Sequence, residues 1–227
     1  GLVHYGWSYI NIDDGWQGIR GGKFNGIQSN RKFPDMKKLA DDLHDMGLKL
    51  GIYSGPWLGT YAGHIGSQCN NPEGIYEWIQ EGKHNANYKY VTPDDTTGNT
   101  VRREHYHHAP YSFARQDAKQ WEEWGVDYLK YDWFPNDCYN TTEMFEALRS
   151  LKRDIVYSLS NTAPYGDAPV WMEKCNCWRT TGDIRDNWKS IYSIGFEGQD
   201  RWLAFNRPGH WADADMLVLG MVGWGPH

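Results

Sequence analysis

The chain has 227 residues and a formal net charge of −6, and 40% of its residues are hydrophobic and 23% charged. These values are typical of one sizeable globular domain. The negative charge disfavours a nucleic acid as partner, and no apolar run is long enough to predict a membrane-spanning helix. Thirteen tryptophans and fifteen tyrosines are typical of a cleft that binds the apolar faces of sugars, although they equally suit core packing.

The first part of the chain alternates predicted strands with a predicted helix. Tyr9–Asp14 alternates apolar and polar residues, which predicts a strand, and Gly18–Lys32, rich in Gly, Asn and Arg, predicts a loop. An apolar stripe predicts a helix that opens at Phe33-Pro34-Asp35 and ends at Gly47. Leu48–Ser54 predicts the next strand. Strand, helix and strand joined by short turns are the signature of a parallel βαβ unit.

The same unit recurs later in the chain. Helices are predicted at about 112–124, 142–151 and 187–194, and strands at 126–132, 155–160, 178–183 and 213–217. Six predicted strands, most of them separated by a helix, indicate an α/β barrel or a doubly wound sheet.

A long polar segment at about 55–110 interrupts this alternation, with one helical patch predicted near Pro72–Gly82. Loops of this length in a compact domain are usually functional or mobile. His105, His107 and His108 lie in the segment, but no companion ligand motif accompanies them, so solvated loop histidines are favoured over metal ligands. We therefore predict no metal site.

The chemistry is expected where acidic residues follow the predicted strands. Asp132 and Lys130 lie two positions apart and therefore share one face of their strand. A charged pair on a buried face is costly unless something satisfies it, so the two residues are either a structural ion pair or a nucleophile beside a lysine that holds a substrate hydroxyl. Carboxylates also end three other predicted strands: Asp13 and Asp14, Asp183, and Asp213 and Asp215.

Barrel enzymes place catalytic groups at the carboxyl ends of their strands, so this pattern favours an active site. No glycine-rich phosphate motif follows any strand, so no nucleotide cofactor is expected. Two carboxylates over one sugar suit glycoside hydrolysis, with Asp132 attacking and Asp183 protonating the leaving oxygen. Lys130 would help Asp132 to stay ionised, and Asp183 would need a less polar setting, for which Trp178 and Ile184 are candidates.

Five segments in order carry a resemblance to a known family. They are Y-I-N-I-D-D-G-W at 9–16, K-F-P-D-M with G-L-K-L-G-I-Y-S within 32–54, W-G-V-D-Y-L-K-Y-D at 124–132, W-R-T-T-G-D-I at 178–184 and W-A-D-A-D-M-L-V-L-G at 211–220. The chain resembles the catalytic barrel of glycoside hydrolase family 27, the α-galactosidases and α-N-acetylgalactosaminidases. The resemblance implies a single catalytic domain over residues 1–227, a partial (β/α)8 TIM barrel that covers strands two to seven. The family's first and eighth strands have no counterpart, so we expect a longer intact protein.

The resemblance also implies roles for individual residues. Asp132 would be the nucleophile of a retaining double displacement, and Asp183 the acid/base. The remaining residues would bind the sugar: Asp13 and Asp14 at the 4- and 6-hydroxyls, Lys130 on the other side of the ring, Arg179 and Asp215 near the 2-position, Tyr53 near the nucleophile, and Trp16 as a wall of the pocket. Asn161 falls where relatives read the 2-substituent.

The exact sugar stays open at this point. Ser160 stands where relatives usually have a cysteine and Asn161 follows at the reading position, and these departures leave the sugar open. Galactose is the first choice, beside N-acetylgalactosamine, β-L-arabinopyranose or an isomaltose-type glucoside. The expected partner is an oligosaccharide or glycoconjugate with a terminal α-linked galactose-like sugar, without cofactor, nucleic acid or membrane. The resemblance also implies a Cys69–Cys138 disulfide. Disulfides belong to oxidising compartments, so a secreted, periplasmic or lysosome-like location is expected, although Gly1–Tyr5 is no signal peptide.

Two alternatives come from other classes of function. The first is a catalytically silent barrel that holds a glycan, which the presence of both Asp132 and Asp183 disfavours. The second is a metal-dependent barrel enzyme that uses the three histidines of the long segment.

Overall fold

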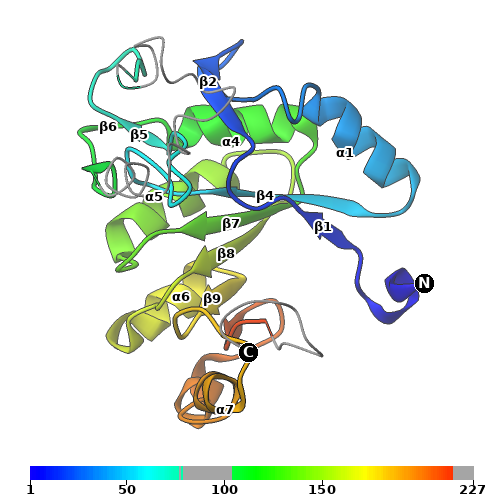
Figure 1. Cartoon of the computed structure of the whole chain (residues 1–227), viewed down its shortest axis with the longest axis vertical. Helices are drawn as coiled ribbons and strands as arrows, with labels where there is room; N and C mark the ends of the chain where they lie inside the picture. Colours follow the sequence, from blue (N-terminus) through cyan, green and yellow to red (C-terminus); the bar gives the residue numbers. More distant parts are fainter. Residues whose placement is uncertain (77, 79–103, 217–227) are drawn as a thin grey trace. The chain divides into compact units, whose positions relative to one another are not determined.

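The computed structural model describes residues 1–76, 78 and 104–216 (Figure 1). These residues form two compact units. The first unit contains Gly1–Asp132 and Glu143–Val156, and the second contains Trp133–Thr142 and the described part of Tyr157–His227. None of the described helices is long and apolar enough to cross a bilayer.

The first unit is built on three parallel strands, β1 (Tyr9–Asn11), β4 (Lys49–Ser54) and β7 (Tyr128–Asp132). β4 lies in the middle and pairs with β1 on one side and with β7 on the other. Its residues from Leu50 to Ser54 are all buried, as expected for a central strand covered on both faces. The register sets Tyr53 beside Lys130.

Two helices pack in this unit, α1 (Met36–Asp45) and α4 (Ala114–Trp124). Figure 1 shows them on the same side of β4, and they contact each other. The Asp35 carboxylate caps α1 by accepting from the Lys38 amide at 2.8 Å, and Gly47 leaves the helix with a left-handed φ of 75°. The predicted helix and both predicted strands around it are confirmed.

The predicted loop at Gly18–Lys32 is wrong, because most of it forms an antiparallel hairpin. β2 (Gln17–Gly21) pairs with β3 (Gly26–Ser29). Gly22 and Asn25 adopt positive φ angles in the turn, which explains why turn-forming residues concealed two short strands. Further along, β5 (Gln68–Cys69) pairs antiparallel with β6 (Tyr111–Ser112) and brings the two ends of the long segment together. The helical patch predicted near 72–82 lies partly outside the described residues.

The second unit contains three more parallel strands, β8 (Val156–Ser160), β9 (Cys177–Arg179) and β10 (Trp211–Asp213), with β9 in the middle. α6 (Ala168–Lys174) separates β8 from β9, and α7 (Trp188–Gly195) lies between β9 and β10. The short α6 was not predicted. α5 (Cys138–Arg149) precedes β8, and its residues are divided between the two units. The described residues also form three 3-10 helices, η1 (Leu2–Tyr5) in the first unit and η2 (Tyr165–Asp167) and η3 (Asp200–Phe205) in the second.

Three strands end earlier than the sequence predicted. β1 stops at Asn11 rather than at Asp14, so Asp13 and Asp14 follow the strand. β9 stops at Arg179, so Asp183 lies on the following loop, and β10 stops at Asp213 rather than beginning there. Parallel strands alternating with helices in both units nevertheless confirm the predicted α/β class.

Candidate active site

Asp132 is the last residue of β7 and is 9% exposed. The neighbouring strand β4 ends at Ser54, and Gly55 follows it so closely that a Cβ there would lie 2.4 Å from the Asp132 carbonyl oxygen. A side chain at position 55 would therefore displace the backbone that carries Asp132. The carboxyl ends of the two strands meet at one edge of the sheet, as predicted for a barrel-type site.

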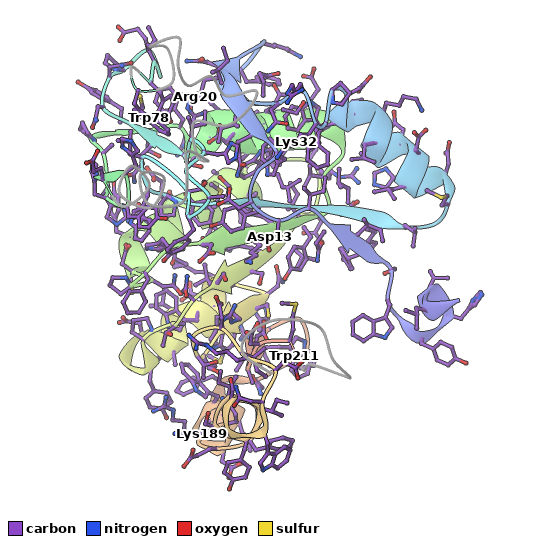
Figure 2. All side chains as sticks on the ribbon, viewed as in Figure 1. Asp13, Arg20, Lys32, Trp78, Lys189 and Trp211 are labelled. Atoms are coloured by element: carbon purple, nitrogen blue, oxygen red, sulfur yellow. The ribbon has the colours of Figure 1, made fainter. Side chains whose placement is uncertain are left out.

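Lys130 forms an ion pair with Asp13, which follows β1 and is labelled in Figure 2. Its Nζ donates to Asp13 Oδ2 at 2.8 Å and lies 5.2 Å from the centre of the Tyr53 ring, a distance suited to a cation–π contact. The sequence left open which group satisfies the lysine charge. In the structure the partner is the Asp13 carboxylate, which follows β1, and Lys130 also contacts the Tyr53 ring.

Asp14 is held by the loop that follows β4. Its Oδ1 accepts from the Thr60 hydroxyl at 2.8 Å and its Oδ2 accepts from the Ala62 amide at 2.6 Å. Burial raises the pKa of Asp14 to about 7, the two hydrogen bonds oppose that rise, and the charges of Asp13 and Asp132 add to it. The carboxylates of Asp13 and Asp132, at the ends of β1 and β7, are therefore close enough to Asp14 for their charges to act on it.

Tyr53 and Trp16 are the buried aromatic residues that were expected in this site. The Tyr53 hydroxyl is buried and makes no hydrogen bond of normal geometry within the described part of the chain. Burial raises its pKa well above the ordinary value, and the charges of Asp14 and Asp132 raise it further. Trp16 donates from Nε1 to the Tyr53 carbonyl at 2.8 Å and packs edge-on against Trp124. Its ring is fully buried, so its expected role as a pocket wall stays a prediction.

The second unit has its own constellation, centred on Arg179 at the end of β9. The guanidinium is almost buried and donates to Asp183 Oδ1 at 2.9 Å, while it lies 3.3 Å from Asp215 Oδ1. It also donates to the Ser160 hydroxyl at 3.4 Å. The Arg179 Nε is buried without a hydrogen-bond partner among the described residues. One cation thus holds two carboxylates and one hydroxyl, each from a different loop or strand end.

The two carboxylates on Arg179 differ sharply in exposure. The Asp215 side chain is 4% exposed and also accepts from the Ile184 amide at 2.7 Å, whereas the Asp183 side chain is 85% exposed. The apolar setting predicted for Asp183 is therefore wrong in this structure. Because β9 stops at Arg179, Asp183 reaches solvent from a loop instead of packing beside Trp178.

Asp215 and Asn161 both lie in strained backbone regions. Asp215 has a φ of 80° and Asn161 a φ of 70°, in the left-handed region that few residues other than glycine adopt. Asp213 Oδ1 accepts from the Asp215 amide at 2.7 Å, which helps to hold that turn. Such strain gathers at functional sites, so Asn161, directly after β8, remains the candidate for reading the sugar's 2-substituent.

The structure thus brings the predicted residues together in two sets. Asp13, Asp14, Tyr53, Lys130 and Asp132 lie in the first unit, together with Trp16. Arg179, Asp183 and Asp215 meet in the second, which also contains Asn161. The separation of the Asp132 and Asp183 carboxyls, expected at roughly 5–5.5 Å in a retaining enzyme, stays a prediction.

Sequence reasoning missed Thr60 and Ala62, the two partners of Asp14. They lie in a long segment without helical or strand periodicity, so no local signal identifies them. Asp213 appeared in the sequence as a strand-end carboxylate without a role, and the structure shows it supporting Asp215.

The cysteines and histidines were considered for a disulfide and for a metal site. Each cysteine is a free thiol within its own unit, and Cys69 and Cys138 lie in different units, so the disulfide that the resemblance implies stays a prediction. His105 stacks on Trp78 at 4.1 Å between ring centres. Among residues 1–76, 78 and 104–216, no group of three or more metal-binding side chains has the arrangement of a metal site.

Comparison with known proteins gives one consistent result. The family profile described as Alpha galactosidase A matches residues 1–73 and 105–226. Alpha-galactosidase 2 of Arabidopsis thaliana is 34% identical over 233 residues, covering 98% of this chain and 47% of that protein. Alpha-N-acetylgalactosaminidase of Gallus gallus is 33% identical over 242 residues, covering 98% and 48%.

Solved structures agree with the sequence matches. Alpha-galactosidase I from Mortierella vinacea has a TM-score of 0.66 and 26% identity, and the match covers 99% of this chain and 53% of that one. The chain spans about half the length of the curated relatives it matches, and its parallel strands and helices form part of the family's barrel, as predicted. The chain belongs to glycoside hydrolase family 27, the α-galactosidase family.

Proposed function

We propose that the protein hydrolyses terminal α-galactosidic linkages by a retaining double displacement. The observation that carries the proposal is the group of three carboxylates and a lysine at the ends of β1 and β7, where Asp132 is almost buried beside Asp13 and Asp14. Relatives named α-galactosidase and α-N-acetylgalactosaminidase support an α-linked galactose-type sugar as the substrate. The natural substrate would be an oligosaccharide or glycoconjugate that ends in such a sugar.

Asp132 attacks the anomeric carbon and forms a covalent glycosyl-enzyme, while Asp183 gives a proton to the leaving oxygen. In the second step Asp183 removes a proton from water, and the water displaces Asp132. The attacking carboxylate has to stay ionised, which the nearby Lys130 charge favours. Lys130 and Asp13 hold sugar hydroxyls with groups that already bond to each other at 2.8 Å, so their geometry is set before the sugar arrives.

The acid role of Asp183 requires a change in its partner. In the free protein the Arg179 guanidinium bonds to Asp183 at 2.9 Å. When Arg179 instead binds the oxygen at the sugar's 2-position, Asp183 loses that partner and is free to turn toward the leaving oxygen. Asp215, which is almost fully buried, keeps Arg179 in place.

The test is a substrate panel on the full-length protein: p-nitrophenyl α-D-galactoside beside the α-N-acetylgalactosaminide and the β-L-arabinopyranoside. We expect the galactoside to have the highest kcat/KM. Asp132→Asn should abolish turnover, whereas Asp154→Asn, a matched change at an exposed carboxylate, should leave the rate unchanged. A near-normal rate in Asp132→Asn would refute the assignment of the nucleophile.

The same panel decides between the proposal and its alternatives. Preference for the acetamido sugar or the pentoside assigns a related family activity. Binding of galactose without turnover of any of the three substrates supports a silent sugar-binding barrel.

A further inference from the structure

The segment that follows β4 holds both oxygens of the half-buried Asp14 carboxylate. The Thr60 hydroxyl bonds to Oδ1 and the Ala62 amide bonds to Oδ2. Both oxygens are therefore fixed, and each has a further lone pair that can accept another hydrogen bond. A carboxylate fixed in this way cannot rotate freely to meet a ligand.

The direction of the Thr60–Asp14 hydrogen bond follows from the other partner of the hydroxyl. The His64 amide donates to Thr60 Oγ1 at 3.0 Å, and an amide N–H can only donate. The hydroxyl has a single proton, so it accepts from His64 and donates to Asp14. The turn is closed by two more bonds, from the Thr60 amide to the His64 carbonyl and from the Gly63 amide to the Thr60 carbonyl, both at 2.8 Å.

Residues near the C-terminal end of the long segment at about 55–110 hold this turn in place. The Tyr106 hydroxyl donates to the Tyr61 carbonyl at 2.7 Å, and the Gly59 amide donates to the His105 carbonyl at 3.0 Å. The rings of Trp57 and Tyr106 stack with 5.4 Å between their centres. The loop around Thr60 is thus supported independently of its contact with Asp14.

The surroundings of Asp14, apart from the loop that follows β4, disfavour its ionised form. Burial and the carboxylates of Asp13 and Asp132 raise its pKa. Lys130 is bonded to Asp13 rather than to Asp14, and the pKa of His64 is lowered to about 4 by burial, so that neighbour is neutral near pH 7. The Tyr53 hydroxyl keeps its proton because its pKa is raised. The hydrogen bonds from the Thr60–Ala62 loop act in the opposite direction.

We propose that Thr60 is a positioning residue, whose hydroxyl holds the Asp14 carboxylate oriented and ready to accept hydrogen bonds from sugar hydroxyls. The sugar-binding part of this inference rests on the proposed function. The positioning of Asp14 does not, because it can be measured without any substrate.

The substrate-free test follows the ¹³C shift of the Asp14 carboxyl against pH in the full-length protein, with Asp14→Asn to assign the signal. We expect a titration midpoint near 7 in the parent, a higher midpoint in Thr60→Val, and the parent value in Thr60→Ser, which keeps the hydroxyl. Thr60→Ala gives the same comparison if valine is not accommodated. Tyr106→Phe is the matched control, since it removes a bond of the same loop without touching Asp14 and should leave the midpoint unchanged.

The kinetic test separates positioning from general loop damage. Thr60→Val should raise KM for the galactoside about tenfold, the loss expected for one hydrogen bond to a charged group, and change kcat by less than about twofold. An unchanged Asp14 midpoint in Thr60→Val, or an equal shift in Thr60→Ser, overturns the inference. If no galactoside is turned over, the proposed function fails while the titration result still decides the role of Thr60.

Discussion

The Arg20–Asp117 pair is the most deeply buried ion pair among the described residues, and its removal should cost far more stability than removal of a surface pair. The two side chains are 1% and 0% exposed. Arg20, which is labelled in Figure 2, lies on β2 and Asp117 lies on α4, so the pair ties the hairpin to the helix. Burial lowers the pKa of Arg20, but the charges and hydrogen bonds of Asp117 and Tyr76 together raise it by more.

The contacts of this pair set the expected magnitude. Arg20 binds both oxygens of Asp117 and donates to the Gly66 carbonyl at 2.8 Å and the Tyr76 hydroxyl at 3.3 Å. Asp117 in turn accepts from the Ile27 amide at 2.9 Å. Arg20→Met leaves a buried carboxylate without its counter-charge, which costs about 3–5 kcal/mol of unfolding free energy.

Urea unfolding at neutral pH measures the loss. The matched control is Lys23→Met, because Lys23 pairs with Glu123 at 3.4 Å while their side chains are 72% and 48% exposed; such a pair contributes at most about 1 kcal/mol. Replacing both partners by Arg20→Met with Asp117→Leu should recover part of the loss, since no lone charge remains buried. A loss in Arg20→Met no larger than in Lys23→Met would refute the reasoning.

Two further predictions concern the site. Gly55→Ala should lower kcat by at least about tenfold, since its Cβ would lie 2.4 Å from the Asp132 carbonyl; Gly166→Ala, whose Cβ would meet nothing within 4 Å, is the control, and equal rates would contradict the prediction. The contribution of Asp14 to the free energy of unfolding should fall as pH rises from 4 to 7, because folded Asp14, with its pKa raised from 3.8 to about 7, holds a proton that the unfolded chain releases. The fall is at most about 4 kcal/mol, about half of that after solvent screening, and His64, whose pKa is lowered to about 4, contributes in the opposite direction. Urea unfolding of the parent and of Asp14→Asn at the two pH values isolates the Asp14 part: the parent should lose stability relative to the variant as pH rises, and a constant difference between them would refute the assignment.

The regular elements of this fold follow closely from the sequence. α1 has an apolar stripe of Met36, Ala40 and Leu43, all buried, with Asp35 at its start and Gly47 at its end. Local periodicity and capping determine such a helix, so they can be read without the rest of the chain.

The hairpin and the short strands do not follow in the same way. β2 and β3 consist largely of glycine and polar residues, and their position depends on Asp117, which is 97 residues from Arg20. β9 has only three residues. Its C-terminal end could therefore not be predicted to within the few residues that decide whether Asp183 is buried or exposed. Contacts between distant residues decide these features, and no local pattern reports them.

The residues of the candidate site also differ in whether local sequence patterns could predict them. The carboxylates near the strand ends were predictable because, within each unit, alternation and strand order bring them to the same edge of the strands. Thr60 was not, since its role depends on a contact with Asp14 across 46 residues inside a segment without periodicity.

The most direct test of the account is to identify the carboxylate that becomes covalently glycosylated. A fluorinated galactosyl fluoride, whose glycosyl-enzyme hydrolyses slowly, would be incubated with the full-length protein, and the labelled peptide found by mass spectrometry after digestion. The account predicts a single galactosyl adduct on the peptide that contains Asp132, and none in Asp132→Asn. An adduct on any other carboxylate, or hydrolysis with inversion at the anomeric carbon, would contradict it.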